Sequence, residues 1–208
     1  MAVYNLQTES ENFIANGFIV HNCYMKRWGK LNPVRFDEKE LKTDLGQGNF
    51  IFVGSSCDMF AEDIPEEWII KTLEHCSKFD QNKYLFQTKN PRAIRRILPT
   101  ESRVCVTLET DRWLPEIMRN SPNPVDRVEQ MRLIRHPLYI TVEPIMDFDL
   151  YTFVDMIREC GPAQVNVGAD SGKNNLPEPP KWKILDLIAE LEKFTTVKQK
   201  SNLKRLLK

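Results

Sequence analysis

Six short apolar runs alternate with segments of helical periodicity across residues 49–208, and this alternation restricts the fold more than any other feature of the sequence. We expect strands at 49–53, 83–87, 103–108, 138–142, 164–167 and 195–198. We expect helices at 65–79, 91–98, 124–135, 150–160 and 179–194. Strands and helices that alternate in this way form right-handed crossovers, so the pattern predicts an α/β fold whose parallel sheet is covered by helices.

Two architectures share this pattern, an open or closed (β/α) barrel and a doubly wound sheet, and periodicity does not separate them. The sequence contains neither a glycine-rich dinucleotide fingerprint nor a phosphate-binding loop, which makes a nucleotide-binding doubly wound sheet the less favoured of the two. With 208 residues, of which 41% are hydrophobic, the chain can bury the core of one main domain. The sequence therefore favours a (β/α) barrel and leaves a doubly wound sheet as the alternative.

The carboxyl ends of the expected strands are where such folds carry their chemistry, and here these ends are unusually polar. The residues at these ends are Gly54, Ser55, Ser56, Cys57, Asp58, Thr88, Lys89, Thr107, Glu109, Glu143, Pro144, Gly168, Ala169, Asp170, Ser171, Gly172 and Lys198. Lys89 and Lys198 could hold a carboxylate or a phosphate, whereas the acidic residues could bind an amine, a hydroxyl or a metal ion. Any one of them could instead cap a helix or form a turn, but their convergence on one edge predicts a binding site.

Charge and cysteine content restrict the partners and the compartment. With 29 basic and 29 acidic residues the chain is formally neutral, so neither nucleic acid nor a membrane is indicated, and only the stretch 198–208 is strongly basic. Five cysteines without close-pair spacing, no signal peptide and no membrane-spanning run predict free thiols in a reducing cytoplasm. Cys76 and Cys160 are expected in the core, whereas Cys57 and Cys105 could face the site.

A different chemistry is suggested by the tripeptide His21-Asn22-Cys23. An asparagine side-chain amide can attack its own backbone carbonyl and cut the chain after Asn22 if His21 supplies a proton. Cys23 could act as the nucleophile that has already accepted an acyl group as a thioester. The tripeptide alone also fits a simple turn, but the residues before it predict a strand at 3–8, an Asn-Gly turn and a second strand at 18–20.

The segment 3–22 resembles the C-terminal end of an intein, and Cys23 resembles the first residue of the extein that follows. The resemblance implies two parts, an intein-derived β-hairpin at 1–22 and a main domain at 23–208. Because the N-terminal part of an intein is absent, the segment is either a split-intein piece that works in trans or a truncated remnant. The resemblance thus implies a partner that carries the N-terminal intein and extein half.

Short motifs of the main domain resemble, in their order and spacing, the phage Gp37/Gp68 family, a radical-SAM-like group. These motifs are Cys23-Tyr24, the run 51–58, Gln87-Thr88-Lys89, the run 106–109, Val142-Glu143-Pro144 and the run 167–172. The resemblance covers about 23–208 and implies a partial (β/α) barrel of the radical SAM type. It also implies two cofactors, a [4Fe-4S] cluster and S-adenosylmethionine, with Cys23 as the last of three cluster cysteines.

Residue roles follow from the resemblance alone. The cofactor-binding residues that it implies are Gly54, Ser55, Ser56, Asp58, Thr107, Gly168, Asp170 and Ser171. Besides the splicing unit, the catalytic residues that it implies are Lys89, Glu109 and Glu143. Gly54-Ser55-Ser56 departs from the usual Gly-Gly-Glu that contacts the methionine amino group, with Asp58 a possible substitute.

The first barrel strand and the other two cluster ligands are absent from the sequence, so we expect the isolated chain to be inactive. The predicted function is the C-terminal half of a radical-SAM-type enzyme that cleaves S-adenosylmethionine reductively and acts on an unknown substrate. Two alternatives remain open. The domain could bind a ligand or a partner without radical chemistry, or it could be a metal-dependent barrel hydrolase that uses the carboxylates at the strand ends.

Overall fold

The computed structural model describes residues 18–19, 35–54, 57–94, 98–172 and 174–208. The chain divides into two compact units, which we call the first unit (1–88 with 93–104) and the second unit (89–92 with 105–208). Within the described residues no helix is long and apolar enough to cross a bilayer.

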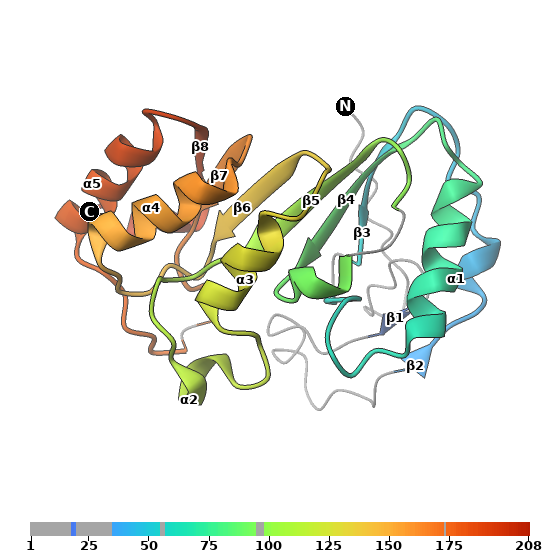
Figure 1. The fold of residues 1–208 in the computed structure, drawn as a ribbon, viewed down its shortest axis with the longest axis horizontal. Helices are drawn as coiled ribbons and strands as arrows, with labels where there is room; N and C mark the ends of the chain where they lie inside the picture. Colours follow the sequence, from blue (N-terminus) through green and yellow to red (C-terminus); the bar gives the residue numbers. More distant parts are fainter. Residues whose placement is uncertain (1–17, 20–34, 55–56, 95–97, 173) are drawn as a thin grey trace. The chain divides into compact units, whose positions relative to one another are not determined.

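In the described part of the chain, six strands form one sheet in the order β3-β4-β5-β6-β7-β8 (Figure 1). Their bounds are Phe50–Val53, Lys83–Thr88, Ser102–Thr107, Leu138–Val142, Gln164–Val167 and Thr196–Gln199. The pairs β3·β4, β6·β7 and β7·β8 are parallel. Each strand lies beside the next one in the chain, so the order lacks the reversal that defines a doubly wound sheet. The predicted parallel α/β sheet is confirmed, and closure into a barrel stays a prediction.

The first unit packs helix α1 (Glu66–Ser77) against strand β4. Pro65 precedes α1 and two glutamates occupy its first turn, where the positive end of the helix dipole favours them. The Tyr84 hydroxyl of β4 donates hydrogen bonds to the carbonyls of Cys76 and Phe79, 2.8 and 2.9 Å away. The buried Tyr84 is thereby satisfied and fixes the end of α1 to the sheet.

The first unit also holds strand β1 (Phe18–Ile19), which pairs antiparallel with β2 (Arg35–Phe36). The sequence predicts a strand at 18–20, but the hairpin partner expected at 3–8 lies outside the described residues. A short 3₁₀ turn, η2 (Glu40–Lys42), follows β2.

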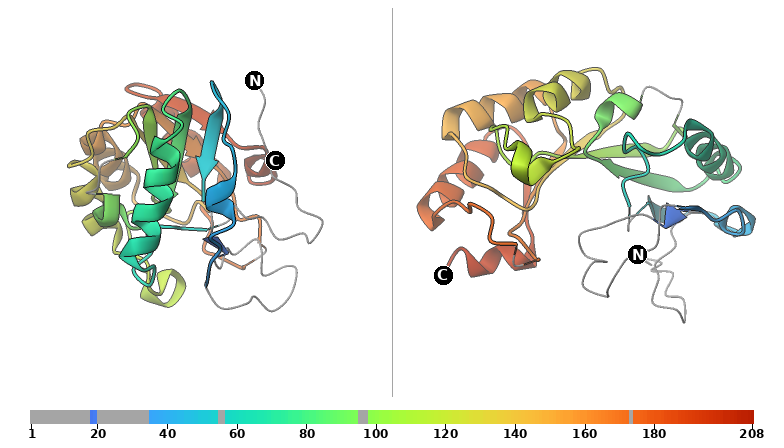
Figure 2. Two further views of the ribbon diagram at one scale, coloured as in Figure 1. Left: turned by 90° about the vertical axis from the view of Figure 1, so that its right-hand side faces the viewer. Right: turned by 90° about the horizontal axis from the view of Figure 1, so that it is seen from below.

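Three helices of the second unit cover one face of its strands: α3 (Pro124–Met131), α4 (Leu150–Cys160) and α5 (Lys181–Leu191) (Figure 2). The apolar residues on one side of each helix are buried, and so are the alternate residues Leu138, Ile140, Val142, Val165 and Val167 of β6 and β7. Two short elements complete the unit, α2 (Pro115–Met118) and the 3₁₀ helix η4 (Ser201–Arg205). Because side chains alternate across a strand, the other residues of β6 and β7 lie on the face without these helices.

Three sequence predictions need correction. The helix expected at 91–98 is only the 3₁₀ turn η3 (Pro91–Ile94), and 95–97 lie outside the described residues. The helix expected at 124–135 ends at Met131, because the chain turns toward β6 and leaves Leu133 exposed. Cys160 is only half-buried on the last turn of α4, where its thiol donates to the Met156 carbonyl, whereas Cys76 is fully buried as expected.

Candidate ligand-binding site at the strand ends of the second unit

The predicted site residues fall into three groups. His21, Asn22, Cys23, Ser55 and Ser56 lie outside the described residues. Gly54 and Asp58 belong to the first unit. The second unit carries the remaining residues, Lys89, Thr107, Glu109, Glu143, Gly168, Asp170 and Ser171. It is therefore the second unit that brings predicted residues together.

In the first unit, Gly54 and Asp58 shape the turn that follows β3. Gly54 has a φ of 68°, and an added Cβ would lie 3.0 Å from the Cys57 carbonyl oxygen, so a larger residue is excluded there. Asp58 accepts a hydrogen bond from the Phe60 N–H at 3.1 Å. A role for either residue in binding a cofactor stays a prediction.

Glu109 forms the first charged cluster of the second unit, two residues beyond the end of β5. Its side chain is 2% exposed and pairs with Arg127 at 2.7 Å and with Lys89. Burial by itself raises the pKa of Glu109, but Lys89 and Arg127 outweigh it and hold the pKa below its ordinary value. Glu109 is thus an internal carboxylate that stays ionised, and Lys89, at 39% exposure, is the part of the cluster that a ligand can reach.

Arg127 was not predicted from the sequence, yet it organises this cluster. It lies on the buried face of α3 beside Val128, and its own side chain is fully buried. Its guanidinium donates to the carbonyls of Pro122 and Thr107, at 2.7 and 2.8 Å, as well as to Glu109. A signal was present, since an arginine among the apolar positions of a helix requires a buried partner.

Glu143 forms the second cluster, directly after β6. One carboxylate oxygen pairs with Lys200, and the other accepts a hydrogen bond from the Asn202 amide at 2.6 Å. Gly168, at the end of β7, allows this approach: an added Cβ would lie 2.9 Å from the Glu143 carboxylate and 3.0 Å from Asn202 Oδ1. Lys198 was predicted to bind here, but it is exposed within β8, and Lys200 makes the contact.

Asp170 forms a third cluster in the turn after β7. Its carboxylate accepts hydrogen bonds from the N–H groups of Gly172 (2.8 Å) and Asn174 (2.5 Å), and from the Asn174 side chain (2.8 Å). Burial raises the pKa of Asp170, but these N–H donors outweigh burial and lower it. Asp170 therefore holds the turn together, and Ser171 lies beside it within 2.8 Å of Asn202.

The helix-free face beneath these clusters is lined by polar side chains. Thr141 of β6 faces Asn166 of β7 in register, and Gln164 donates a hydrogen bond to Asn166 at 2.7 Å. Among the described residues, the buried Thr141 Oγ1 and Asn202 Oδ1 have no hydrogen-bond partner. Buried polar atoms are nearly always paired, so these two oxygens are places where a ligand or a water molecule would bind.

The described cysteines do not fit an iron–sulfur cluster. No three His, Cys, Asp or Glu side chains of the described residues come together in a way that could hold a metal ion. Burial raises the pKa of the Cys57, Cys76 and Cys105 thiols to about 12, so they are protonated at neutral pH. Cys57 and Cys105 are buried and do not reach a site as thiolates, and Cys23 lies outside the described residues.

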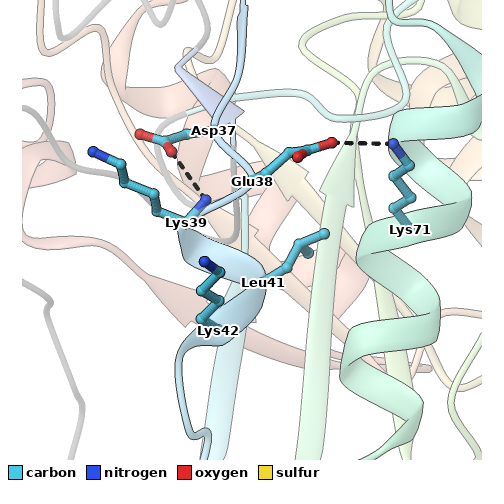
Figure 3. A pocket seen from close by; sticks show the side chains of 6 residues that line it. All are labelled: Asp37, Glu38, Lys39, Leu41, Lys42 and Lys71. Carbon is cyan, nitrogen blue, oxygen red and sulfur yellow. Dashed lines mark hydrogen bonds and ion pairs between the residues drawn. The ribbon is translucent and has the colours of Figure 1, made fainter.

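A surface hollow in the first unit is lined mainly by charged side chains of the segment after β2, of η2 and of α1 (Figure 3). Its lining residues are Asp37, Glu38, Lys39, Leu41, Lys42 and Lys71. Glu38 and Lys71 form an exposed ion pair at 3.3 Å, and such pairs contribute little stability. None of the predicted site residues lines this hollow, and we assign no ligand to it.

Comparison with known proteins identifies a family for most of the chain. A family model described as "Protein of unknown function (DUF5131)" matches residues 11–193. No curated protein matches the chain. A solved structure of a spore photoproduct lyase mutant, with bound AdoMet and dinucleoside spore photoproduct, aligns with a TM-score of 0.48 and 10% identity over 82% of this chain. The chain spans 56% of the length of that structure, and so low a likeness supports no functional argument.

Proposed function

Because this chain belongs to the DUF5131 family, whose function is unknown, we propose a function from its own residues. We propose that it is the C-terminal part of a radical-SAM-type enzyme, and that the strand ends of the second unit bind S-adenosylmethionine. The sequential strand order and the motifs at the strand ends, which resemble radical-SAM-like phage proteins in order and spacing, support this proposal.

The observation that carries the proposal is the polar, helix-free face of the second unit with its two carboxylate–cation pairs. Glu109 pairs with Lys89 and Glu143 pairs with Lys200, and both lysines are accessible, at 39% and 45% exposure. A zwitterion such as S-adenosylmethionine presents a carboxylate to a lysine and N–H and O–H donors to oxygen acceptors. Thr141 Oγ1 and Asn202 Oδ1 are such acceptors, so the chemistry of these residues suits this cofactor.

The iron–sulfur cluster has to be completed from outside this chain. In our proposal Cys23 is one ligand, and an upstream half supplies two more cysteines. His21, Asn22 and Cys23 would join the two halves by splicing, with loss of residues 1–22. The family match includes residues 11–22, so removal of this segment is a separate point to test.

The first test is S-adenosylmethionine binding to this chain, measured by isothermal titration calorimetry. We expect saturable binding that weakens in Lys89→Ala and Lys200→Ala. Lys204→Ala serves as the control, because Lys204 is an exposed lysine of η4, four residues from Lys200 in the sequence. Absence of binding, or equal loss in all three variants, would contradict the proposed site.

The second test uses this chain mixed with an upstream half. Mass spectrometry should show a ligated product that lacks residues 1–22, and Cys23→Ala should prevent its formation. After anaerobic loading with iron and sulfide, the ligated product should be coloured and should cleave S-adenosylmethionine under reduction. A colourless product would show that the radical-SAM assignment is wrong.

A second candidate is a barrel domain that binds a ligand without radical chemistry. One observation favours it: the polar face and both carboxylate–cation pairs are complete within this chain, without Cys23. Binding of S-adenosylmethionine without iron and without cleavage in the ligated protein would select this candidate. A metal-dependent hydrolase fits less well, since Glu109, Glu143 and Asp170 are already engaged by cations or N–H donors.

A further inference from the structure

Apart from Lys200 and Asn202, the stretch 198–208 has no role in the proposed chemistry so far, although it is the only strongly basic part of the sequence. In the structure it leaves β8, and the Lys200 N–H donates to the Val167 carbonyl at the end of β7, 2.8 Å away. Helix η4 follows, and its Leu203 is fully buried. The segment 200–205 is therefore anchored at the strand ends of the second unit.

Asn202 reaches from this segment to two strand ends at once. Its Nδ2 lies 2.6 Å from the Glu143 carboxylate, 2.8 Å from the Ala169 carbonyl and 2.8 Å from the Ser171 hydroxyl. These acceptors fix the orientation of the amide group. The orientation in turn fixes where Asn202 Oδ1 points, the buried oxygen without a partner among the described residues.

Arg205 makes a parallel connection to the turn after β7. Its guanidinium donates to the Asp170 carbonyl at 2.9 Å and to Glu178 at 2.7 Å. Glu178 accepts in addition from the Asp170 N–H at 3.1 Å, so Arg205 and Glu178 together hold both backbone groups of Asp170. A segment that only covered the edge of the sheet would not need side-chain contacts to the loops that follow two different strands.

We propose that Asn202 and Arg205 are positioning residues, and that the segment 200–205, which we call the clamp, holds Glu143 and the 168–178 turn in the geometry that binds the ligand. The part of this inference that concerns the ligand rests on the proposed function. The part that concerns the turn does not. The positive charge of the segment does not by itself explain these contacts, because Lys204 of the same helix is exposed and makes no such contact among the described residues.

The test compares Arg205→Gln, Arg205→Lys and the control Lys204→Gln by hydrogen exchange of the turn. In Arg205→Gln the amides of Gly172 and Asn174, which donate to Asp170, should exchange about tenfold faster, because local opening becomes easier. Arg205→Lys should restore part of the protection, and Lys204→Gln should match the wild type. Asn202→Leu, which keeps the volume and removes the amide, should expose the same turn.

Each outcome decides the matter. Faster exchange in Arg205→Gln that is confined to 168–178, with an unchanged melting temperature, supports the clamp. In that case S-adenosylmethionine should bind about tenfold more weakly to Arg205→Gln than to Lys204→Gln. Unchanged exchange in Arg205→Gln overturns the proposal, and so does a uniform increase over the whole chain, which would mean a merely structural role. If the turn opens locally but the wild type binds no S-adenosylmethionine, the positioning role stands and the proposed function fails.

Discussion

Replacing Arg127 with methionine tests whether the buried Glu109 cluster stabilises the second unit. Methionine fits the volume of a long side chain but donates no hydrogen bond. The substitution removes the donors to Glu109, to Thr107 and to the Pro122 carbonyl. Glu109 would remain almost fully buried with Lys89 as its only cation among the described residues.

The structure sets the expected cost. Breaking a fully buried ion pair by removing one partner costs about 3–5 kcal/mol, because the remaining charge is left uncompensated. Lys89 stays in place but is 39% exposed and partly screened, so it compensates only part of the loss. We therefore expect Arg127→Met to lower the free energy of unfolding by about 3 kcal/mol at pH 7.

Urea unfolding followed by circular dichroism measures this cost, with Arg132→Met as the matched control. Arg132 follows the last residue of α3, and its pair with Glu159 at 3.6 Å is more than half exposed on both sides. Such surface pairs contribute roughly 0–1 kcal/mol. The double variant Arg127→Met/Glu109→Gln should recover part of the loss, since it no longer buries an uncompensated charge.

The pH dependence supplies a second check on the same pair. The pKa of Glu109 in the fold lies below its ordinary value of 4.5, so its stabilising effect is present above pH 4.5 and is lost as pH falls through the lowered pKa. Arg127→Met removes a cause of that lowering, so its deficit should shrink as the medium is made acidic. The reasoning is wrong if Arg127→Met costs no more than Arg132→Met, or if its deficit grows toward low pH.

Three further predictions concern other parts of the chain. Gly168→Ala should lower the free energy of unfolding by about 1–3 kcal/mol and weaken ligand binding, because its Cβ would crowd the Glu143 carboxylate; unchanged calorimetric binding would contradict this. Burial lowers the pKa of His75 from its ordinary value of 6.5, so just below pH 6.5 the His75 imidazole binds a proton in the unfolded chain but not in the fold, and the free energy of unfolding falls as pH drops. In His75→Phe the urea midpoints at about pH 7.5 and 5.5 should therefore differ less than in the wild type. Asp149→Ala should cost about 1 kcal/mol, because Asp149 caps α4 by accepting from the Thr152 N–H, and a melting curve equal to the wild type would refute it.

Local signals in the sequence were sufficient for most elements. The helix expected at 150–160 has those bounds in the structure, since Asp149 caps its start and Gly161, with a φ of 58°, ends it. The strands expected at 138–142 and 164–167 also match, because alternation of apolar residues along short runs defines them. The predicted boundary of a helix was wrong where no capping residue or glycine marks it, as at the end of α3.

The candidate site was predictable only in part, for a physical reason. Strand-end carboxylates such as Glu109 and Glu143 were found from their position, but their partners were not. Arg127 lies 18 residues from Glu109, and Asn202 lies 59 residues from Glu143. Pairings over such separations depend on how the helices and strands pack, which periodicity does not encode. Lys198 lies within β8, whereas Lys200, which makes the contact with Glu143, follows the strand as the residue before η4.

The sequential order of the strands determines how the sheet can come apart. Each strand from β3 to β8 is hydrogen-bonded to its neighbour in the chain, so detaching an end strand disturbs one pairing only. Strand β8 is such an end strand, and all but one of its residues are exposed. Fraying of the sheet should therefore begin at β8 and leave the inner strands paired, and the rate of that fraying will limit how long the C-terminal edge survives proteolysis.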